Sequence, residues 1–236
     1  APERIAAGIR GDNIHFPRTA LLCLENTHNR HGGAVLTAEQ MAAMAAAAHT
    51  HGVPVHLDGA RLFNAAAALG VSAASLAGPV DSVMFCLSKG LCAPVGSLLA
   101  GSKEFVARAR RHRKQLGGGM RQAGILAAAG LIGLREMAPR LAEDHANARR
   151  LVEGLASIRG LAVDPSAVRT NIVVFSVAPL GLTSEEFLAR LASRGVLGVS
   201  FGPETVRFVT HHDVETRQID EALKMTAEVA REALGR

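Results

Sequence analysis

The chain has 236 residues, of which 48% are hydrophobic, and its 26 basic and 21 acidic side chains give a net charge of +5. A chain of this length forms one large domain, or one large and one small domain, and needs no disulfides to hold its core. The absence of Trp and Tyr argues against a nucleic-acid partner, which would stack its bases on aromatic side chains. No apolar run reaches the roughly 18 residues of a membrane span, so we expect a cytoplasmic protein with no membrane partner.

Up to residue 101, short apolar runs alternate with helical segments. The runs predict four strands, at residues 20–25, 54–58, 81–88 and 96–101. A capping box at Thr37 and Gln40 opens the first intervening helix, which Gly52 ends, and residues 59–70 form the next helix. Alternating strands and helices are typical of βαβ units and of a mainly parallel sheet, although the short link between the last two strands favours a hairpin.

From Ser102 onward helices predominate. Ser102 caps a basic helix to about Lys114, and an apolar helix follows to about Met137. We expect the basic segment to be a solvated helix face or a site for an anionic cofactor. The later elements are a long amphipathic helix, a strand, a helix, a strand and a last helix, expected at residues 139–158, 171–177, 183 onward, 205–211 and 213 onward. We therefore expect an α/β fold in which residues 1–138 belong to a large domain and residues 139–236 form a smaller α+β domain.

A lysine, Lys89, stands where one predicted strand ends, among apolar and small neighbours that suit an interior. A buried lysine loses its proton readily and can act as a nucleophile in Schiff-base chemistry. Asp58 closes the strand at residues 54–58 and Arg61 follows it, and side chains that follow neighbouring parallel strands share one crevice. A lysine, an acid and an arginine in one crevice fit pyridoxal phosphate with a substrate carboxylate. Each residue alone also has a plain reading, because Asp-Gly often forms a turn and a following arginine often lies on the surface.

Five segments of the chain carry a family resemblance. They are "LENTHN" (24–29), "HLDGAR" (56–61), "SVMFCLSKGLCAPVGS" (82–97), "GGGMRQAG" (117–124) and "VTHHDV" (209–214). Together they closely resemble the low-specificity L-threonine aldolases, which are pyridoxal-phosphate enzymes of the aspartate-aminotransferase fold, and the resemblance covers nearly the whole chain. The fold it implies is an incomplete, mainly parallel large domain of the pyridoxal-phosphate-transferase type with a smaller C-terminal α+β domain.

The resemblance also assigns roles to residues that bind the cofactor and the substrate. Lys89 looks like the lysine that forms the Schiff base, and Asp58 looks like the partner of the pyridine nitrogen. Arg61 and Arg207 look like the two arginines that hold the substrate carboxylate, with Arg61 also close to the cofactor.

Three further residues have a family role and a structural alternative. His15 is similar to the active-site histidine near the substrate hydroxyl, where it would act as the base, but it could also be an ordinary loop residue. Lys114 and Arg121, which flank the triple glycine, resemble basic residues that approach the cofactor or its phosphate from a neighbouring subunit. The triple glycine itself could equally be a plain hinge.

The reaction that the resemblance implies is the retro-aldol cleavage of L-threonine or L-allo-threonine to glycine and acetaldehyde in threonine catabolism. We expect a homo-oligomer, either a dimer or a tetramer. A β-eliminating lyase on the same fold would use the same Asp58 and Lys89 without needing a base at the hydroxyl. A third reading is a catalytically silent fragment that folds as an assembly subunit.

This sequence departs from the family at its start. Family members begin with a further segment of about a hundred residues that, by resemblance, contributes strands and a phosphate-binding loop. We therefore expect this chain to be the C-terminal part of a longer enzyme, with a companion N-terminal segment, and to have little activity alone.

Cysteine and histidine patterns predict neither disulfides nor a metal site. Cys23, Cys86 and Cys92 form no CxxC pair, so we expect reduced thiols. The segments "HNRH" (28–31) and "HTH" (49–51) have no cysteine or carboxylate partners at metal-ligand spacing. The segment "HHD" (211–213) is expected to end a strand and cap a helix.

Overall fold

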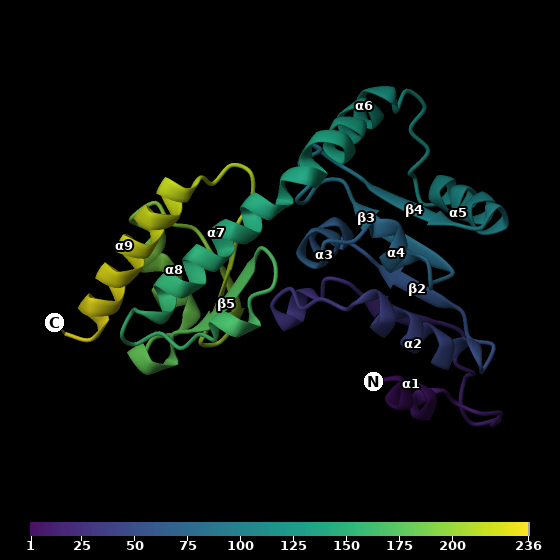
Figure 1. Ribbon diagram of the computed structural model, residues 1–236, viewed down its shortest axis with the longest axis horizontal. Helices are drawn as coiled ribbons and strands as arrows, with labels where there is room; N and C mark the ends of the chain where they lie inside the picture. The colour runs from purple at the N-terminus through teal and green to yellow at the C-terminus, as the bar shows by residue number, and fades with distance from the viewer. Residues whose placement is uncertain (236) are drawn as a thin grey trace. The chain divides into compact units, whose positions relative to one another are not determined.

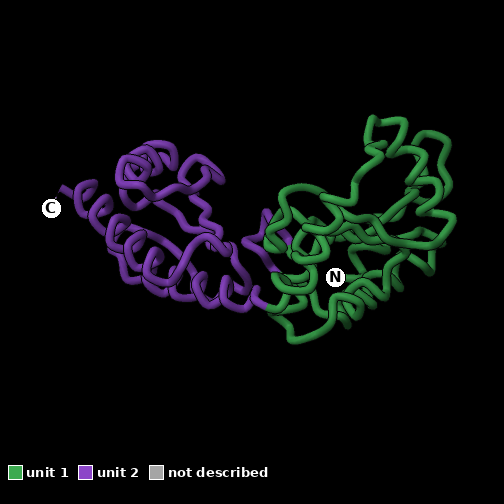
Figure 2. Tube along the Cα trace, turned by 90° about the horizontal axis from the view of Figure 1, so that it is seen from above, with its two compact units in different colours: residues 1–27, 35–139 green, residues 28–34, 140–236 purple. Residues whose placement is uncertain are grey.

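The structure is a computed structural model that describes residues 1–235. It divides them into two compact units, shown in Figure 2: unit 1 comprises residues 1–27 and 35–139, and unit 2 comprises residues 28–34 and those from 140 onward. The main division lies next to the expected one at residue 138, whereas the assignment of residues 28–34 to unit 2 was not foreseen. None of the described helices is long and apolar enough to cross a bilayer. The three cysteines are free thiols, as expected.

Unit 1 is built on one four-stranded sheet. Its strands are β1 (Leu22–Glu25), β2 (Val55–Asp58), β3 (Ser82–Cys86) and β4 (Ser97–Gly101), in that order across the sheet. The first three strands are parallel and β4 pairs antiparallel with β3 (Figure 1). The predicted parallel sheet with a hairpin-like last strand is therefore confirmed.

Helices pack against the face of this sheet to which the buried apolar side chains of the strands point. Val55 and Leu57 are fully buried, while the intervening His56 is only half-buried, and Leu57 packs with Met41, Leu62 and Leu76. These partners come from the helices α2 (Ala38–His49), α3 (Leu62–Leu69) and α4 (Ala73–Ala77). The predicted capping box at the start of α2 is present, with Thr37 and Gln40 as its two partners. The short helices α1 (Pro2–Gly8) and α4 were not predicted.

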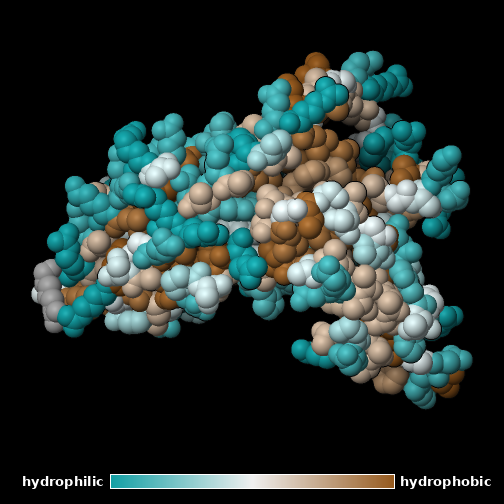
Figure 3. All heavy atoms as spheres, in the orientation of Figure 1, coloured by the Kyte–Doolittle hydropathy of each residue, from teal (hydrophilic) through white to brown (hydrophobic). Residues whose placement is uncertain are grey.

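The rest of unit 1 is more open. Helix α5 (Lys103–Gln115) has Ser102 as its N-cap and no buried residue, so its basic face is solvated as expected. Helix α6 (Gly124–Ile132) continues through a π-helical turn, η2 (Gly133–Met137). All five residues of β4 are exposed. Figure 3 shows apolar side chains gathered between α6 and strands β3 and β4; the exposed large apolar residues of β4 and α6 are Leu98, Leu99, Ile125, Leu131 and Ile132.

Unit 2 is a three-stranded antiparallel sheet packed with helices. The strands are β5 (Ile172–Ser176), β6 (Val199–Gly202) and β7 (Thr205–Val209), in the order β5-β7-β6. The helices are α7 (Ala138–Ala156), α8 (Ser184–Ala192) and α9 (Thr216–Ala233), with short 3-10 turns at η1 (Asn29–His31), η3 (Pro165–Ala167) and η4 (Ala178–Leu180). The capping box that opens α8 is confirmed, β6 was not predicted, and the N-cap of α9 is Glu215 rather than the expected Asp213.

Candidate active site

Asp58 lies at the carboxyl end of β2, where backbone hydrogen bonds hold the ends of three strands together. Its carbonyl oxygen accepts a hydrogen bond from the backbone of Asn26 (3.0 Å), and the next residue, Gly59, donates to the carbonyl oxygen of Met84 (2.8 Å). A Cβ at Gly59 would lie only 2.8 Å from that same oxygen, so only glycine permits this approach. The half-buried Asp58 carboxylate accepts a hydrogen bond from the backbone of Ala60 (2.9 Å), which fixes its Oδ1.

Lys89 lies in a tight turn that follows the neighbouring strand β3. The backbone of Ala93 donates to the carbonyl oxygen of Leu87 (3.0 Å), and that of Cys92 donates to the carbonyl oxygen of Lys89 (2.9 Å). Leu87 and Leu91 are buried and anchor the turn, and Gly133 passes so close that a Cβ there would lie 2.5 Å from the carbonyl oxygen of Leu91.

Because β2 and β3 are adjacent and parallel, their carboxyl ends lie at the same edge of one sheet, and Asp58 and Lys89 are both at this edge. Arg61 is half-buried at the N-cap of α3, three residues after Asp58 at this edge. The expectation that the two strands are parallel neighbours is confirmed, and a shared role for the three side chains stays a prediction. The expectation that Lys89 lies in the interior is wrong: the residue is exposed in the structure of residues 1–235. Its apolar neighbours Leu87 and Leu91 are buried, and Lys89 lies at the exposed tip of the turn.

Two residues at this edge were given no role by the sequence argument. Asn26 and Thr27 follow β1, and both are buried. The Asn26 amide is tied to the backbone of Leu36 at 2.9 and 3.2 Å, whereas the buried Oγ1 of Thr27 has no hydrogen-bond partner among the described residues. The strand-end rule that selects Asp58 also selects this pair, so a signal was available. A carboxylate, a primary amine and an unpaired hydroxyl at one sheet edge can bind a small polar ring.

His15 is not brought to this edge. It is exposed in the loop that leads into the amino end of β1, and its backbone N–H donates to Oδ1 of Asn13 (2.8 Å). Parts of the same loop line a pocket with His51, which precedes β2, so the loop lies at the opposite ends of the strands. The role of His15 as a base stays a prediction.

The basic pair around the triple glycine is also separate from Asp58 and Lys89. Lys114 is exposed near the end of α5, and its side chain folds over Gly119, where a Cβ would meet Nζ at 2.8 Å. Arg121 is exposed in the following segment. No hydrogen bond or ion pair within residues 1–235 joins either side chain to Asp58 or Lys89, and their approach to a phosphate stays a prediction.

Arg207, the second predicted carboxylate ligand, lies on β7 in unit 2. Its Nη1 donates to Oδ1 of Asn29 (2.8 Å), and its guanidinium carbon lies 5.0 Å from the ring centre of Phe201. Asn29 and Phe201 were not predicted as functional residues. Asn29 is 178 residues away in sequence, so no local pattern could reveal the contact.

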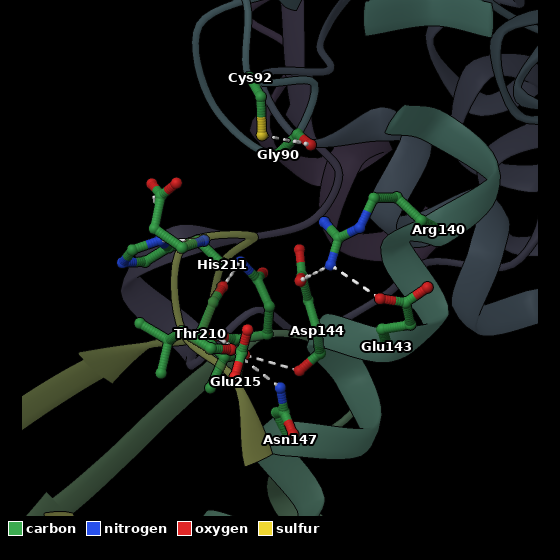
Figure 4. A network of polar contacts seen from close by, with 12 residues as sticks. Gly90, Cys92, Arg140, Glu143, Asp144, Asn147, Thr210, His211 and Glu215 are labelled. Carbon is green, nitrogen blue, oxygen red and sulfur yellow. Dashed lines mark hydrogen bonds and ion pairs between the residues drawn. The ribbon is translucent and has the colours of Figure 1, made fainter. Parts of the chain in front are cut away.

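A buried polar network in unit 2 also escaped prediction (Figure 4). Arg140 donates to the fully buried Asp144 (3.0 Å), and the hydroxyl of Thr210 donates to the Asp144 carbonyl oxygen (2.6 Å). Burial raises the pKa of the Asp144 carboxyl, and the charge of Arg140 opposes that rise. On the same helix, burial and then the charge of Arg149 lower the pKa of His145 to about 4.

Comparisons with known proteins show a family and a fold. The sequence profile of the beta-eliminating lyases matches residues 1–178. The chain is 44% identical over 220 residues to low-specificity L-threonine aldolase 1 of Arabidopsis thaliana, covering 92% of this chain and 62% of the relative. It is 43% identical over 223 residues to the low specificity L-threonine aldolase of Escherichia coli K12, covering 93% of this chain and 63% of the relative. The chain thus spans less than two thirds of these relatives' length.

A solved structure shows the same fold. The threonine aldolase of Leishmania major superposes with a TM-score of 0.74 at 20% identity, over 97% of this chain and 66% of that one. At this identity the match concerns the backbone arrangement and carries no residue role.

Proposed function

Because the chain belongs to the beta-eliminating lyase family, we propose that it is part of a pyridoxal-phosphate-dependent aldolase. This enzyme would cleave L-threonine and L-allo-threonine to glycine and acetaldehyde. The observation that carries this proposal is the placement of Asp58 and Lys89 after adjacent parallel strands. The identity of 43–44% to two low-specificity L-threonine aldolases supports the choice of substrate.

The residues at the sheet edge fit the cofactor by their chemistry. The Lys89 amine would bond the cofactor aldehyde, and the Asp58 carboxylate would hold a proton on the ring nitrogen. The buried, unpaired Oγ1 of Thr27 offers a partner for a further polar atom of the ring. When bound, pyridoxal phosphate supplies an electron sink for the bond that breaks.

The remaining roles belong to residues that orient the substrate and move its proton. Arg61 and Arg207 would hold the α-carboxylate, which sets the Cα–Cβ bond in the orientation that favours its cleavage. A base takes the hydroxyl proton as acetaldehyde leaves. His15 is our candidate for it on the family resemblance alone, since its loop lies at the opposite ends of the strands in this structure. Lys114 and Arg121 would approach the cofactor phosphate, each from a neighbouring subunit.

The alternative function is β-elimination on the same fold, which the family description itself favours. It needs Asp58 and Lys89 but no base at a hydroxyl. Product analysis separates the two reactions, because the aldolase releases glycine with an aldehyde, whereas elimination releases a keto acid with ammonia.

The proposal is tested by incubating the full-length protein with L-threonine and measuring acetaldehyde and glycine. Lys89→Ala should reduce acetaldehyde formation by roughly 10³-fold or more, because the nucleophilic amine is lost. Lys103→Ala, which removes an exposed lysine of α5 in the same unit, is the matched control and should leave the rate unchanged. Equal rates for the two variants would contradict the role of Lys89.

Three further expectations accompany the activity. We infer that the protein is cytoplasmic and that it forms a homo-oligomer, either a dimer or a tetramer. Analytical ultracentrifugation would measure the number of subunits. We also infer that the 236 residues alone have little activity. Assaying them beside the full-length gene product tests this, and comparable rates would contradict it.

A further inference from the structure

Arg207 is held at three points within unit 2. Its backbone lies in the central strand of the sheet, opposite Val174 on β5 and Val199 on β6. Its side chain donates from Nη1 to Asn29 and lies against the ring of Phe201. A guanidinium stacked on a ring and bonded at one end has a fixed plane and a fixed rotation.

One edge of this guanidinium has no hydrogen-bond partner among the described residues. The Nε of Arg207 is buried and has no hydrogen-bond partner among the described residues, and no described carboxylate pairs with the side chain. A buried N–H without a partner is costly. Since Asn29 occupies Nη1, the remaining edge is Nε with Nη2, and two parallel N–H groups match the two oxygens of a carboxylate.

Asn29 is itself held in place rather than carried on a loose loop. The backbone of His28 donates to the carbonyl oxygen of Ala34 (2.8 Å), and that of Gly33 donates back to His28 (3.0 Å). The hydroxyl of Thr170 donates to the carbonyl oxygen of Gly33 (3.1 Å), and a Cβ at Gly33 would lie 2.4 Å from that hydroxyl oxygen. These contacts fix the backbone on both sides of Asn29, whose Oδ1 accepts from Arg207.

We propose that Asn29 is a positioning residue that engages Nη1 of Arg207 and thereby turns the Nε–Nη2 edge toward the α-carboxylate of the amino-acid substrate. This inference rests on the proposed function and adds to it the residue that sets the orientation of the carboxylate ligand. Phe201 supports the same orientation from the face of the guanidinium. Asn29 does not touch the substrate, so it acts only through Arg207.

The kinetic test compares two asparagines of unit 2 in the full-length protein loaded with pyridoxal phosphate. Asn29→Ala should raise KM for L-threonine and lower kcat/KM about tenfold, because Arg207 both binds the carboxylate and orients the bond that breaks. Asn147→Ala is the matched control. It removes a half-buried amide that bonds Val214 at 3.1 Å and Thr216 at 3.0 Å, so it costs a similar structural contact, and KM should not change. An equal rise of KM in both variants would overturn the proposal.

A second readout does not depend on turnover. The ¹⁵N–¹H signal of the Arg207 Nε, assigned by its loss in Arg207→Lys, should shift when glycine is titrated as the carboxylate probe. In Asn29→Ala the same shift should need about tenfold more glycine. Absence of the shift in the wild type overturns the proposal even if threonine is cleaved. If the wild type forms no acetaldehyde, the proposed function fails, and the glycine titration still decides the role of Asn29.

Discussion

The two units bury their apolar residues in different ways. Unit 2 has one cluster of fifteen buried residues in which Phe175 contacts both Phe187 and Phe208. Unit 1 has three separate clusters of at most six buried residues. Among the described residues it also carries twelve of the fourteen exposed large apolar side chains, including Leu116 at 88% and Ile125 at 82% exposure. Unit 2 is therefore closed around a core, whereas unit 1 is open.

The difference separates stability from chemistry. The carboxylate of Asp58 and the amine of Lys89 lie at the sheet edge of the open unit. The Lys89 residue is exposed there and contributes little to the packing of the unit. The closed unit contains Arg207, the proposed carboxylate ligand, which its sheet and Asn29 hold in place. Substitutions in the core of unit 2 should therefore affect the free energy of unfolding, and substitutions at the edge of unit 1 should affect mainly the rate.

The largest expected effect is the loss of stability when a core side chain of unit 2 is removed. Phe175→Ala removes a fully buried ring and should lower the free energy of unfolding by about 3–5 kcal/mol. The matched change Phe16→Ala removes a ring of unit 1 that is 56% exposed, and it should cost less than about 1 kcal/mol. Denaturant unfolding of the two variants measures both values. Similar losses would show that unit 1 is as closely packed as unit 2.

Sequence patterns predicted the elements that have strong local signals. Both Thr capping boxes and all the strands except β6 were found, because cap spacing and apolar runs act over a few neighbouring residues. The placement of Asp58 and Lys89 followed from a rule about strand ends, since adjacent parallel strands end at one edge.

Other features depend on residues that are distant in sequence. The short helices α1 and α4 have too few residues for a clear helical period. The strand β6 has no buried residue and so lacks the apolar run that marks the other strands predicted from the sequence. The exposure of Lys89 depends on how Leu87 and Leu91 pack, which the sequence of the turn does not state. The bond between Arg207 and Asn29 joins β7 to a segment near the start of the chain, and only the folded chain brings the two together.

A second prediction concerns how the stability of unit 2 depends on pH. Burial lowers the pKa of His145 in unit 2 to about 4 from an ordinary value of 6.5. Between these values the unfolded chain binds a proton that the folded chain does not, so the stability of unit 2 is complete above pH 6.5 and falls as the pH drops toward 4. We expect a loss of about 2 kcal/mol over this window, allowing for partial exposure of the ring.

Unfolding measured at several pH values checks this expectation. His145→Gln should remove most of the slope between pH 6.5 and 4. His51→Gln, which changes an exposed histidine of unit 1 just after α2, should leave the slope unchanged. A slope that survives in His145→Gln would place the titrating group elsewhere.

The smallest effect concerns exposed polar pairs, one in each unit. Asp81 accepts hydrogen bonds from the backbone of Val55 (2.7 Å) and from His49 (2.9 Å), and these bonds lower its pKa. Such a contribution is present above the ordinary pKa of 3.8 and is lost as the pH falls through the lowered value. Because the Asp81 side chain is 50% exposed, Asp81→Asn should cost less than about 1 kcal/mol at neutral pH.

The matched change in unit 2 is Asp220→Asn, which weakens the pair with Arg150, where the Asp220 side chain is 48% exposed. It should cost equally little, because water screens both pairs to a similar degree. Thermal unfolding at low and high salt measures the two costs. If they agree, apolar packing rather than surface charge distinguishes the units, whereas a cost above about 2 kcal/mol for Asp81→Asn alone would mean that polar contacts hold unit 1 together.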